Sequence, residues 1–196
     1  GIAGAMAFAE GRGVALATAE RHEDPWEGDT FQTEDGEEWT RIAGAEGRSG
    51  TWAHVSTHLA HGNGVFVAAE FGLLTHRVLW SEDAVTWTAA EGFGERADVH
   101  SLSFANDRFL AVGNWGSPRR KVLGVSTNGR EWEFVTDSAE NRVPIMRKIL
   151  HADGRYYSIA GNIVTFGDDL KFTATPNAMA AKITDFVHAE GMYVGV

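Results

Sequence analysis

Short apolar runs alternate along this chain with turns rich in Gly, Asp and Asn, and the runs come in pairs. The first pair, residues 6–9 and 14–17, flanks a turn at 10–13. Comparable pairs flank turns at 62–64, 106–107, 152–154 and 190–191. Short strands bounded by such residues are typical of antiparallel hairpins. The pattern therefore predicts a succession of β-hairpins along the whole chain.

A second pattern, a seven-residue turn, follows the hairpins. It reads TEDGEEW at 33–39, SEDAVTW at 81–87, STNGREW at 126–132 and, less faithfully, FGDDLKF at 166–172. We call these four segments the repeat turns. Their closing aromatic residues stand 48, 45 and 40 residues apart (39 to 87, 87 to 132 and 132 to 172). Periods of this length are typical of propellers and other repeat architectures.

The residue types in the repeat turns predict structural roles. A hydroxyl and an Asp or Asn side chain can hydrogen-bond the backbone of a tight turn, and Gly accepts a positive φ. We expect each Asp or Asn to cap its own turn, and each closing aromatic to fold back onto its own sheet at an equivalent, largely buried position. The residues given these roles are Thr33, Asp35, Gly36, Trp39, Ser81, Asp83, Trp87, Ser126, Asn128, Gly129, Trp132, Asp168 and Phe172.

Each repeat would supply four antiparallel strands, which is one propeller blade. We therefore predict an all-β fold, a whole or partial β-propeller of about four and a half repeats in a single domain. The expected blades cover about residues 1–47, 48–95, 96–141 and 142–178, with a partial blade at 179–196.

The fifth repeat stops after its second strand, which would leave an unpaired sheet edge. Three arrangements fit this pattern. The chain is a piece of a longer propeller of roughly seven blades, or it closes with a two-stranded last blade, or copies associate to complete the ring.

The repeat turn, Ser/Thr-x-Asp-Gly-x-x-Trp, resembles the Asp-box or BNR-like repeat of sialidase-type β-propellers, and the resemblance covers nearly the whole chain. It implies that the turns join the third and outermost strands of each blade, on the face away from the usual site. That family includes glycosidases, adhesins and assembly factors. The resemblance therefore implies a fold without selecting one function.

Composition removes several classes of function. The net charge of −10 argues against a nucleic-acid surface, which requires a basic footprint. No apolar run approaches the length of a membrane span. Cysteine is absent, so disulfides and thiolate ligands are excluded. We expect no cofactor, and the compartment, secreted or cytoplasmic, stays open.

The loops between the second and third strands, and the connections between blades, differ most between repeats. Function concentrates on such loops when a rigid scaffold holds them. Their aromatic and basic residues form our candidate binding surface, on the face opposite the repeat turns: Trp26, Trp52, His76, Arg96, Trp115, Arg119, Arg120 and Arg142. Such residues suit an anionic group, for example a carboxylate. The alternative is that each Trp is folded under its own blade and the charged loops are only solvated.

The residues that a metal site or a sialidase active site would need are not found in a suitable arrangement. His54 and His58 would lie about 13 Å apart along one strand, too far to share a zinc ion. A sialidase needs a Tyr nucleophile and a carboxylate pair, but Tyr156 and Tyr193 fall in second-strand positions that predict core packing. We predict no metal site and no catalytic residue.

The sequence therefore favours a non-catalytic binding or scaffolding propeller that recognises a glycan, an anionic peptide or a protein through one loop face. A sialidase-like glycoside hydrolase and an accessory or assembly factor of a biosynthetic pathway are the alternatives.

Overall fold

The computed structural model describes residues 2–9, 11–18, 28–42, 55–71, 76–93, 97–115, 118, 120–136, 138–139, 141–144, 146, 149–159, 163–175, 186–189 and 192–195. Within these ranges all of the regular secondary structure is β-strand. The prediction of an all-β fold is confirmed.

The strands form four four-stranded antiparallel sheets and one hairpin. The first sheet holds β1 (Ile2–Ala9), β2 (Arg12–Thr18), β3 (Gly28–Thr33) and β4 (Thr40–Ile42). The second holds β5 (Val55–Gly62), β6 (Val65–Phe71), β7 (His76–Ser81) and β8 (Thr88–Ala89). The third holds β9 (Asp98–Ala105), β10 (Arg108–Trp115), β11 (Arg120–Ser126) and β12 (Glu133–Thr136).

The fourth sheet holds β13 (Ile149–Ala152), β14 (Arg155–Ile159), β15 (Ile163–Phe166) and β16 (Phe172–Thr175). The last pair is β17 (Phe186–Ala189) with β18 (Met192–Gly195). In each complete sheet the spatial order is the chain order, so each is an up-and-down blade. The predicted blade bounds fall in connections only partly described, and they stay predictions.

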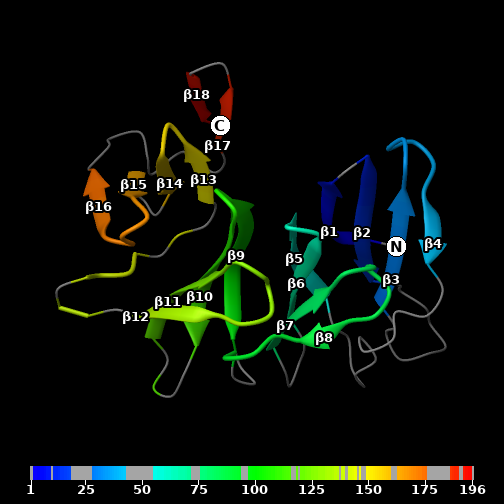
Figure 1. Ribbon diagram of the computed structural model, residues 1–196, viewed down its shortest axis with the longest axis horizontal. Coiled ribbons are helices and arrows are strands. Elements are labelled where there is room, and N and C mark those ends of the chain that lie inside the picture. The colour runs from blue at the N-terminus through cyan, green and yellow to red at the C-terminus, as the bar shows by residue number, and fades with distance from the viewer. Residues whose placement is uncertain are drawn as a thin grey trace.

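The sheets follow one another in an arc (Figure 1). Their first strands are innermost, and β1 contacts β5, β5 contacts β9, β9 contacts β13, and β13 contacts β17. The first sheet and the β17–β18 hairpin form the two ends of the arc. This is the arrangement of consecutive blades in a β-propeller.

Side chains alternate between the two faces of a strand, so each sheet has one face toward the preceding sheet and one toward the following sheet. Leu59 of β5 shares a core with Val14 and Leu16 of the first sheet. Its neighbour Ala60 belongs instead to the core shared with the third sheet. Three apolar seams result, one between each pair of complete sheets.

Three of the four closing aromatics, Trp87, Trp132 and Phe172, lie in these seams, and this corrects two expectations. Trp87 packs with Val14 and Leu16 of the preceding sheet, and not on its own sheet alone. Trp132 likewise shares a core with residues of the second sheet. Trp39 is only half-buried, because no sheet precedes its own among the described residues. Phe172 is half-buried as well. The four rings are therefore not equally deep.

The innermost strands of the first three sheets each carry a β-bulge at the same distance from the hairpin turn. The register shifts between Ala3 and Ala5 in β1, and between Ser56 and His58 in β5. In β9 the extra residue is His100, between partners of Val112 and Gly113. A bulge re-aims the side chain that it carries. The inner strands therefore bend at one level, near the end of the sheets opposite the repeat turns.

Candidate functional site

The repeat turns mark one end of every sheet, which we call the turn end, and the opposite end is the loop end. His76 is the first residue of β7, and Ser81 of the repeat turn is the last. Arg120 and Ser126 have the same relation in β11. His76 and the exposed Arg120 therefore lie at the loop end, where the sequence predicts a binding surface.

Two other predicted site residues are placed differently. Trp115 is 6% exposed and packs against Phe93 and Phe134, with ring centroids 5.2 and 5.5 Å away. Its ring is buried and is not available to a ligand at the surface. This agrees with the alternative that each Trp is folded under its own blade. Trp26, Trp52, Arg96 and Arg119 lie outside the described residues.

Arg142 is also displaced from the expected face. The side chain of the preceding residue, Asn141, donates to the carbonyl of Leu170 at 3.0 Å. The same side chain accepts from the backbone N–H of Phe172 at 3.5 Å. Both partners belong to the fourth repeat turn, so Arg142 is exposed beside the turn end and cannot act together with His76 and Arg120.

A cavity of about 190 Å³ opens at the loop end of the seam between the second and third sheets. We call it the seam pocket. Its lining comes from β5, β6 and β7 on one side and from β9 and the residue before it on the other: His58, Ala69, Glu70, His76, Ala97, Asp98, Val99 and His100. His76 is thus the described member of the predicted site that lines the seam pocket. The buried Ala97 also packs with Trp115, which therefore supports the pocket wall.

Glu70 is the buried carboxylate of the seam pocket. Its side chain has no exposed surface, and an oxygen accepts a hydrogen bond from the Arg77 guanidinium at 3.0 Å. A buried carboxylate is tolerated when it is paired in this way. Arg77 itself is partly exposed, so the ion pair joins the pocket interior to its rim.

His58 and His100 face each other across the seam. The imidazole of His58 donates a hydrogen bond to the backbone of His100, the bulged residue. Burial lowers the pKa of His58, and the charge of a protonated His100 lowers it further. The hydrogen bond raises the pKa, but burial is the largest effect and the pKa of His58 is lowered overall. His58 is therefore predominantly neutral at pH 7.

The bulge at His100 depends on the glycine that opposes it. A Cβ at Gly113 would stand 2.0 Å from the carbonyl oxygen of Asp98. The side chain of the next residue, Asn114, meets His100 Nε2 at 2.7 Å. Asp98 is 4.0 Å from the same nitrogen. The third sheet thus holds one imidazole between an amide and a carboxylate at the pocket mouth.

Sequence analysis missed Glu70, Asp98 and His100. The loop-end position of His100 can be found by counting residues back from each hairpin turn. This count places His58 and His100 near the same level of two adjacent inner strands. The bulge at His100 leaves no residue signature that distinguishes it from a regular strand.

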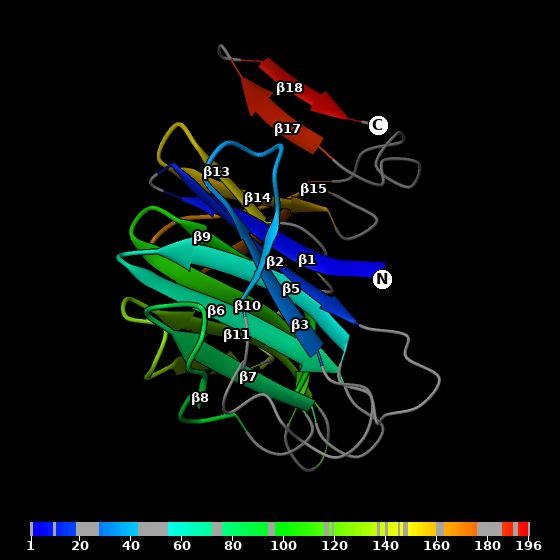
Figure 2. The same ribbon diagram turned by 90° about the vertical axis from the view of Figure 1, so that its right-hand side faces the viewer.

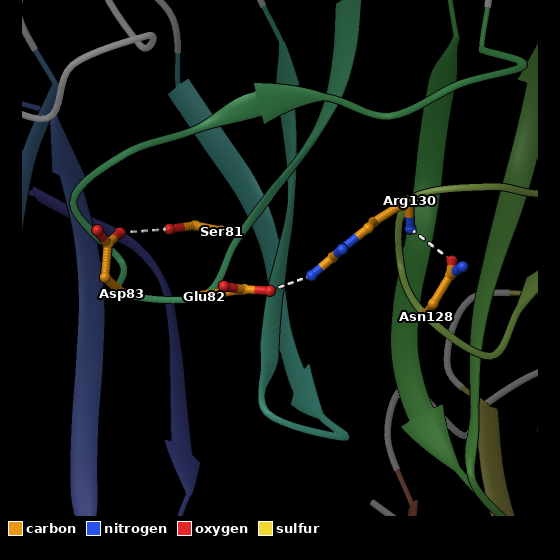
Figure 3. A network of polar contacts seen from close by, with 5 residues as sticks. All are labelled: Ser81, Glu82, Asp83, Asn128 and Arg130. Carbon is orange, nitrogen blue, oxygen red and sulfur yellow. Dashed lines mark hydrogen bonds and ion pairs between the residues drawn. The ribbon is translucent and has the colours of Figure 1, made fainter.

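The turn end shows how the repeat turns are built. In the second turn the Ser81 hydroxyl donates to Asp83 Oδ1 at 2.9 Å (Figure 3). The same oxygen accepts the backbone N–H groups of Val85 and Thr86 at 2.8 and 2.7 Å. The first and third turns repeat these contacts, with Asp35 and Asn128 as acceptors.

The fourth repeat turn departs from this pattern. Phe166 replaces the hydroxyl residue, and the positive φ moves to Leu170. Asp168 faces the third sheet, where it accepts from Asn106 at 3.3 Å and pairs with Arg108 at 3.5 Å. The expectation that Asp168 caps its own turn is therefore wrong, since Asp169 takes the contact to Lys171 N–H.

Other ties cross between sheets at the turn end. Arg130 of the third repeat turn reaches Glu82 of the second, as Figure 3 shows. Its guanidinium lies 4.3 Å from the centre of the Trp80 ring. Asn63 donates to the carbonyl of Thr127 at 3.1 Å. The seam between the second and third sheets is thus tied at the end opposite the seam pocket.

Among the described residues, no group of three or more His, Asp or Glu side chains is arranged to hold a metal ion. The described ranges also contain no helix with the length and apolarity that crossing a lipid bilayer demands.

Comparison with known proteins gives the fold class. No family model and no curated protein match the chain in sequence. Solved β-propeller structures do resemble it. YCF48 bound to a D1 peptide is 18% identical with a TM-score of 0.50, and the match covers 87% of this chain and 51% of that one.

Two further structures agree. A Bacteroides uniformis protein named as a 6-phosphogluconolactonase is 16% identical with a TM-score of 0.56, covering 96% of this chain and 61% of that one. An exo-β-1,3-galactanase from Phanerochaete chrysosporium is 12% identical with a TM-score of 0.53, covering 91% and 51%. This chain therefore spans about half to three fifths of the length of these structures. At such identities the likeness establishes the β-propeller fold alone.

Proposed function

We propose that this chain is a non-catalytic β-propeller of the Asp-box type that binds a peptide segment of a partner protein at the seam pocket. The observation that carries the proposal is the pocket itself: three imidazoles gathered at the loop end of one seam, around a carboxylate that Arg77 already neutralises.

The size of the pocket favours a peptide group over a glycan chain. Pockets that enclose drug-sized ligands measure about 300–1,000 Å³. The seam pocket, at about 190 Å³, has room for one side chain or a chain terminus. A peptide could place such a group in the pocket while the rest of it lies across the loop end.

The charges at the rim favour an anionic group. Inside the pocket Glu70 is paired with Arg77, and Asp98 lies 4.0 Å from His100. The nearby cation of the third sheet is Arg120, which pairs in register with Trp115 at the loop end. Imidazole and guanidinium groups both donate to carboxylates. The peptide complex of YCF48 shows that a propeller of similar fold binds a peptide.

A glycoside hydrolase needs two carboxyl groups that reach the scissile bond. In the seam pocket Glu70 cannot serve, because its side chain is wholly buried and held by Arg77. The binding role is therefore favoured over the sialidase-like one. An accessory or assembly factor would use the same peptide site, so that alternative is a special case of the proposal.

The test is a titration with three fluorescent peptides that differ at one residue: Asp, Asn or Lys. We expect the Asp peptide to bind at least about tenfold more tightly than the Lys peptide. His76→Ala and Arg120→Ala should each weaken binding of the Asp peptide, while Arg155→Ala, which replaces an exposed arginine at the turn end, should not.

Equal binding of the three peptides, or equal loss with Arg155→Ala, would contradict the anionic assignment. Binding or cleavage of a xylan or galactan oligosaccharide, with no peptide bound, would favour the hydrolase alternative.

A further inference from the structure

The chain contains two Asn-Gly pairs, and the structure places them in different surroundings. The β5–β6 hairpin, whose turn lies at the left in Figure 2, has the exposed Asn63 and Gly64 at its tip. Asn128 and Gly129 lie in the third repeat turn, where Asn128 is half-buried and Gly129 is buried. An asparagine before a glycine readily loses its side-chain amide, because glycine has no side chain to block the approach to its backbone nitrogen. The two pairs therefore carry the same chemistry in two environments.

The pair at the hairpin tip is open to this reaction. Asn63 and Gly64 have φ of 49° and 73°, the left-handed conformation of a two-residue hairpin turn. The hydrogen bond that closes such a turn joins the flanking residues, here Gly62 and Val65, and does not use the N–H of Gly64. A Cβ at Gly64 would meet nothing within 4 Å, so the surrounding structure leaves room beside its nitrogen.

The pair in the third repeat turn is held by the contacts of that turn. The N–H of Gly129, on the nitrogen that would attack, donates to Ser126 Oγ at 2.8 Å. The amide oxygen of Asn128 accepts the backbone N–H groups of Arg130 and Glu131 at 2.9 and 3.0 Å (Figure 3). A side chain of the second sheet also lies 2.6 Å from where a Cβ of Gly129 would stand. The same reaction here would first have to break these contacts.

We infer that Asn63 is a site of spontaneous deamidation, with water as the co-reactant, and that the third repeat turn protects Asn128. The backbone nitrogen of Gly64 attacks Asn63 Cγ and closes a cyclic imide. The bond between Cγ and the side-chain nitrogen breaks, and that nitrogen leaves as ammonia with the proton from the Gly64 nitrogen. Water then opens the ring at one of its two carbonyls, which yields aspartate or isoaspartate. The inference goes beyond the proposed peptide binding and does not depend on it.

The modification would loosen the seam between the second and third sheets at the turn end. The side-chain amide of Asn63 donates to the carbonyls of Thr127 at 3.1 Å and Asp107 at 3.5 Å, both in turns of the third sheet. A carboxylate has no proton to donate, and it would face two carbonyl oxygens. Isoaspartate would also lengthen the backbone of a two-residue turn by one carbon atom. Deamidation therefore removes a contact that joins the two sheets.

The test is to hold the folded protein at pH 8 and to follow deamidation by mass spectrometry of tryptic peptides. Trypsin releases the two sites on separate peptides, residues 49–77 and 122–130. Asn63 should convert at least about tenfold faster than Asn128, because several hydrogen bonds must break before Asn128 can react. In urea, where both turns are unfolded, the two rates should become similar.

Equal rates in the folded chain, or faster conversion of Asn128, would overturn the inference. The same holds if folded Asn63 stays intact over a period in which the unfolded chain reacts.

The stability of two variants that mimic the products tests the consequence. At pH 7 Asn63→Asp should raise the equilibrium constant of unfolding about fivefold or more, because the contact with Thr127 is lost. Asn128→Asp is the matched control and should unfold as the parent does, since Asp83 accepts the equivalent hydrogen bonds in the second turn. An Asn63→Asp variant as stable as the parent would show that deamidation leaves the seam intact.

Discussion

At the residue scale, the repeat turns need an oxygen acceptor and not a charge. Asn128 Oδ1 accepts the N–H groups of Arg130 and Glu131 at 2.9 and 3.0 Å, the contacts that Asp83 makes in the second turn. Charge does add a pH dependence. Burial raises the pKa of Asp83, but hydrogen bonds from Thr86, Val85 and Ser81 outweigh it and lower the pKa overall.

This difference predicts the behaviour of Asp83→Asn. The amide should keep the turn contacts and leave the free energy of unfolding near that of the parent at pH 7. Asp83→Ala should cost about 1 kcal/mol, because two backbone donors lose their acceptor. A depressed carboxyl pKa stabilises the fold above its unfolded value, and that stability is lost as pH falls through the folded value.

Asp83→Asn should therefore lose less stability than the parent between pH 4.5 and pH 2.5, a range around the ordinary aspartate pKa of 3.8. Urea denaturation at both pH values measures this. An equal acid loss in both proteins would contradict the assigned contacts.

A glycine in the third repeat turn provides the second prediction. Gly129 has φ +71°, and a Cβ there would stand 2.6 Å from Val67 Cγ2 of the second sheet. Gly129→Ala should destabilise the protein by roughly 2–3 kcal/mol, from the left-handed backbone and the clash together.

Gly36→Ala is the matched control for the third-turn variant. Gly36 has φ +82°, but nothing lies within 4 Å of the added Cβ, so only the backbone cost of about 1 kcal/mol remains. Chemical denaturation compares the two variants, and equal losses would show that the seam does not constrain Gly129.

At the element scale, the inner strands β5 and β9 contact each other at the seam pocket, where His58 donates a hydrogen bond to the backbone of His100. The pKa of His58 is lowered chiefly by burial, so the folded protein favours its neutral form. A base with a depressed folded pKa has no effect on stability well above its unfolded value of 6.5, and it destabilises the fold as pH falls below that value.

His58→Gln tests this effect, since an amide donates a hydrogen bond but does not titrate. The free energy of unfolding should fall less steeply between pH 7.5 and pH 5.5 in His58→Gln than in the parent. Denaturant titrations across that range give both slopes. Parallel curves would mean that the protonation of His58 does not disturb the seam.

The sequence predicts the elements well and the pocket poorly, for physical reasons. Strands with alternating faces and turns that require positive φ are encoded locally, so the repeat turns and hairpins were recognisable. The seam pocket depends on a bulge and on which side chains of two sheets meet across it. Trp115 illustrates the difficulty: its sequence neighbours suggest an exposed loop, yet Phe93 of the connection before β9 and Phe134 of its own sheet cover the ring.

At the scale of the whole molecule, the position of a sheet in the arc decides what its closing aromatic contributes. Trp87 is 3% exposed within a complete seam, whereas Trp39 has no preceding sheet among the described residues. Trp87→Ala should cost about 3–5 kcal/mol, as other buried large aromatics do.

Trp39→Ala should cost less than about half of that, because its ring already meets solvent. Thermal and chemical denaturation of the two variants measure both losses. Equal losses would show that the first sheet is as well covered as the second.

The ties at the turn end give the second seam a mechanical asymmetry. The second and third sheets are held together at the turn end by the contacts of Arg130 with Glu82 and Trp80 and of Asn63 with Thr127. A ligand that enters between His58 and His100 would therefore separate the two sheets at the loop end, with the turn end as the hinge. Spin labels on the exposed Thr86 and Glu131, at the turn end, should therefore keep their separation when peptide binds, while labels on the exposed Ala89 and Thr136, nearer the loop end, move apart. The reverse result would place the pivot at the loop end.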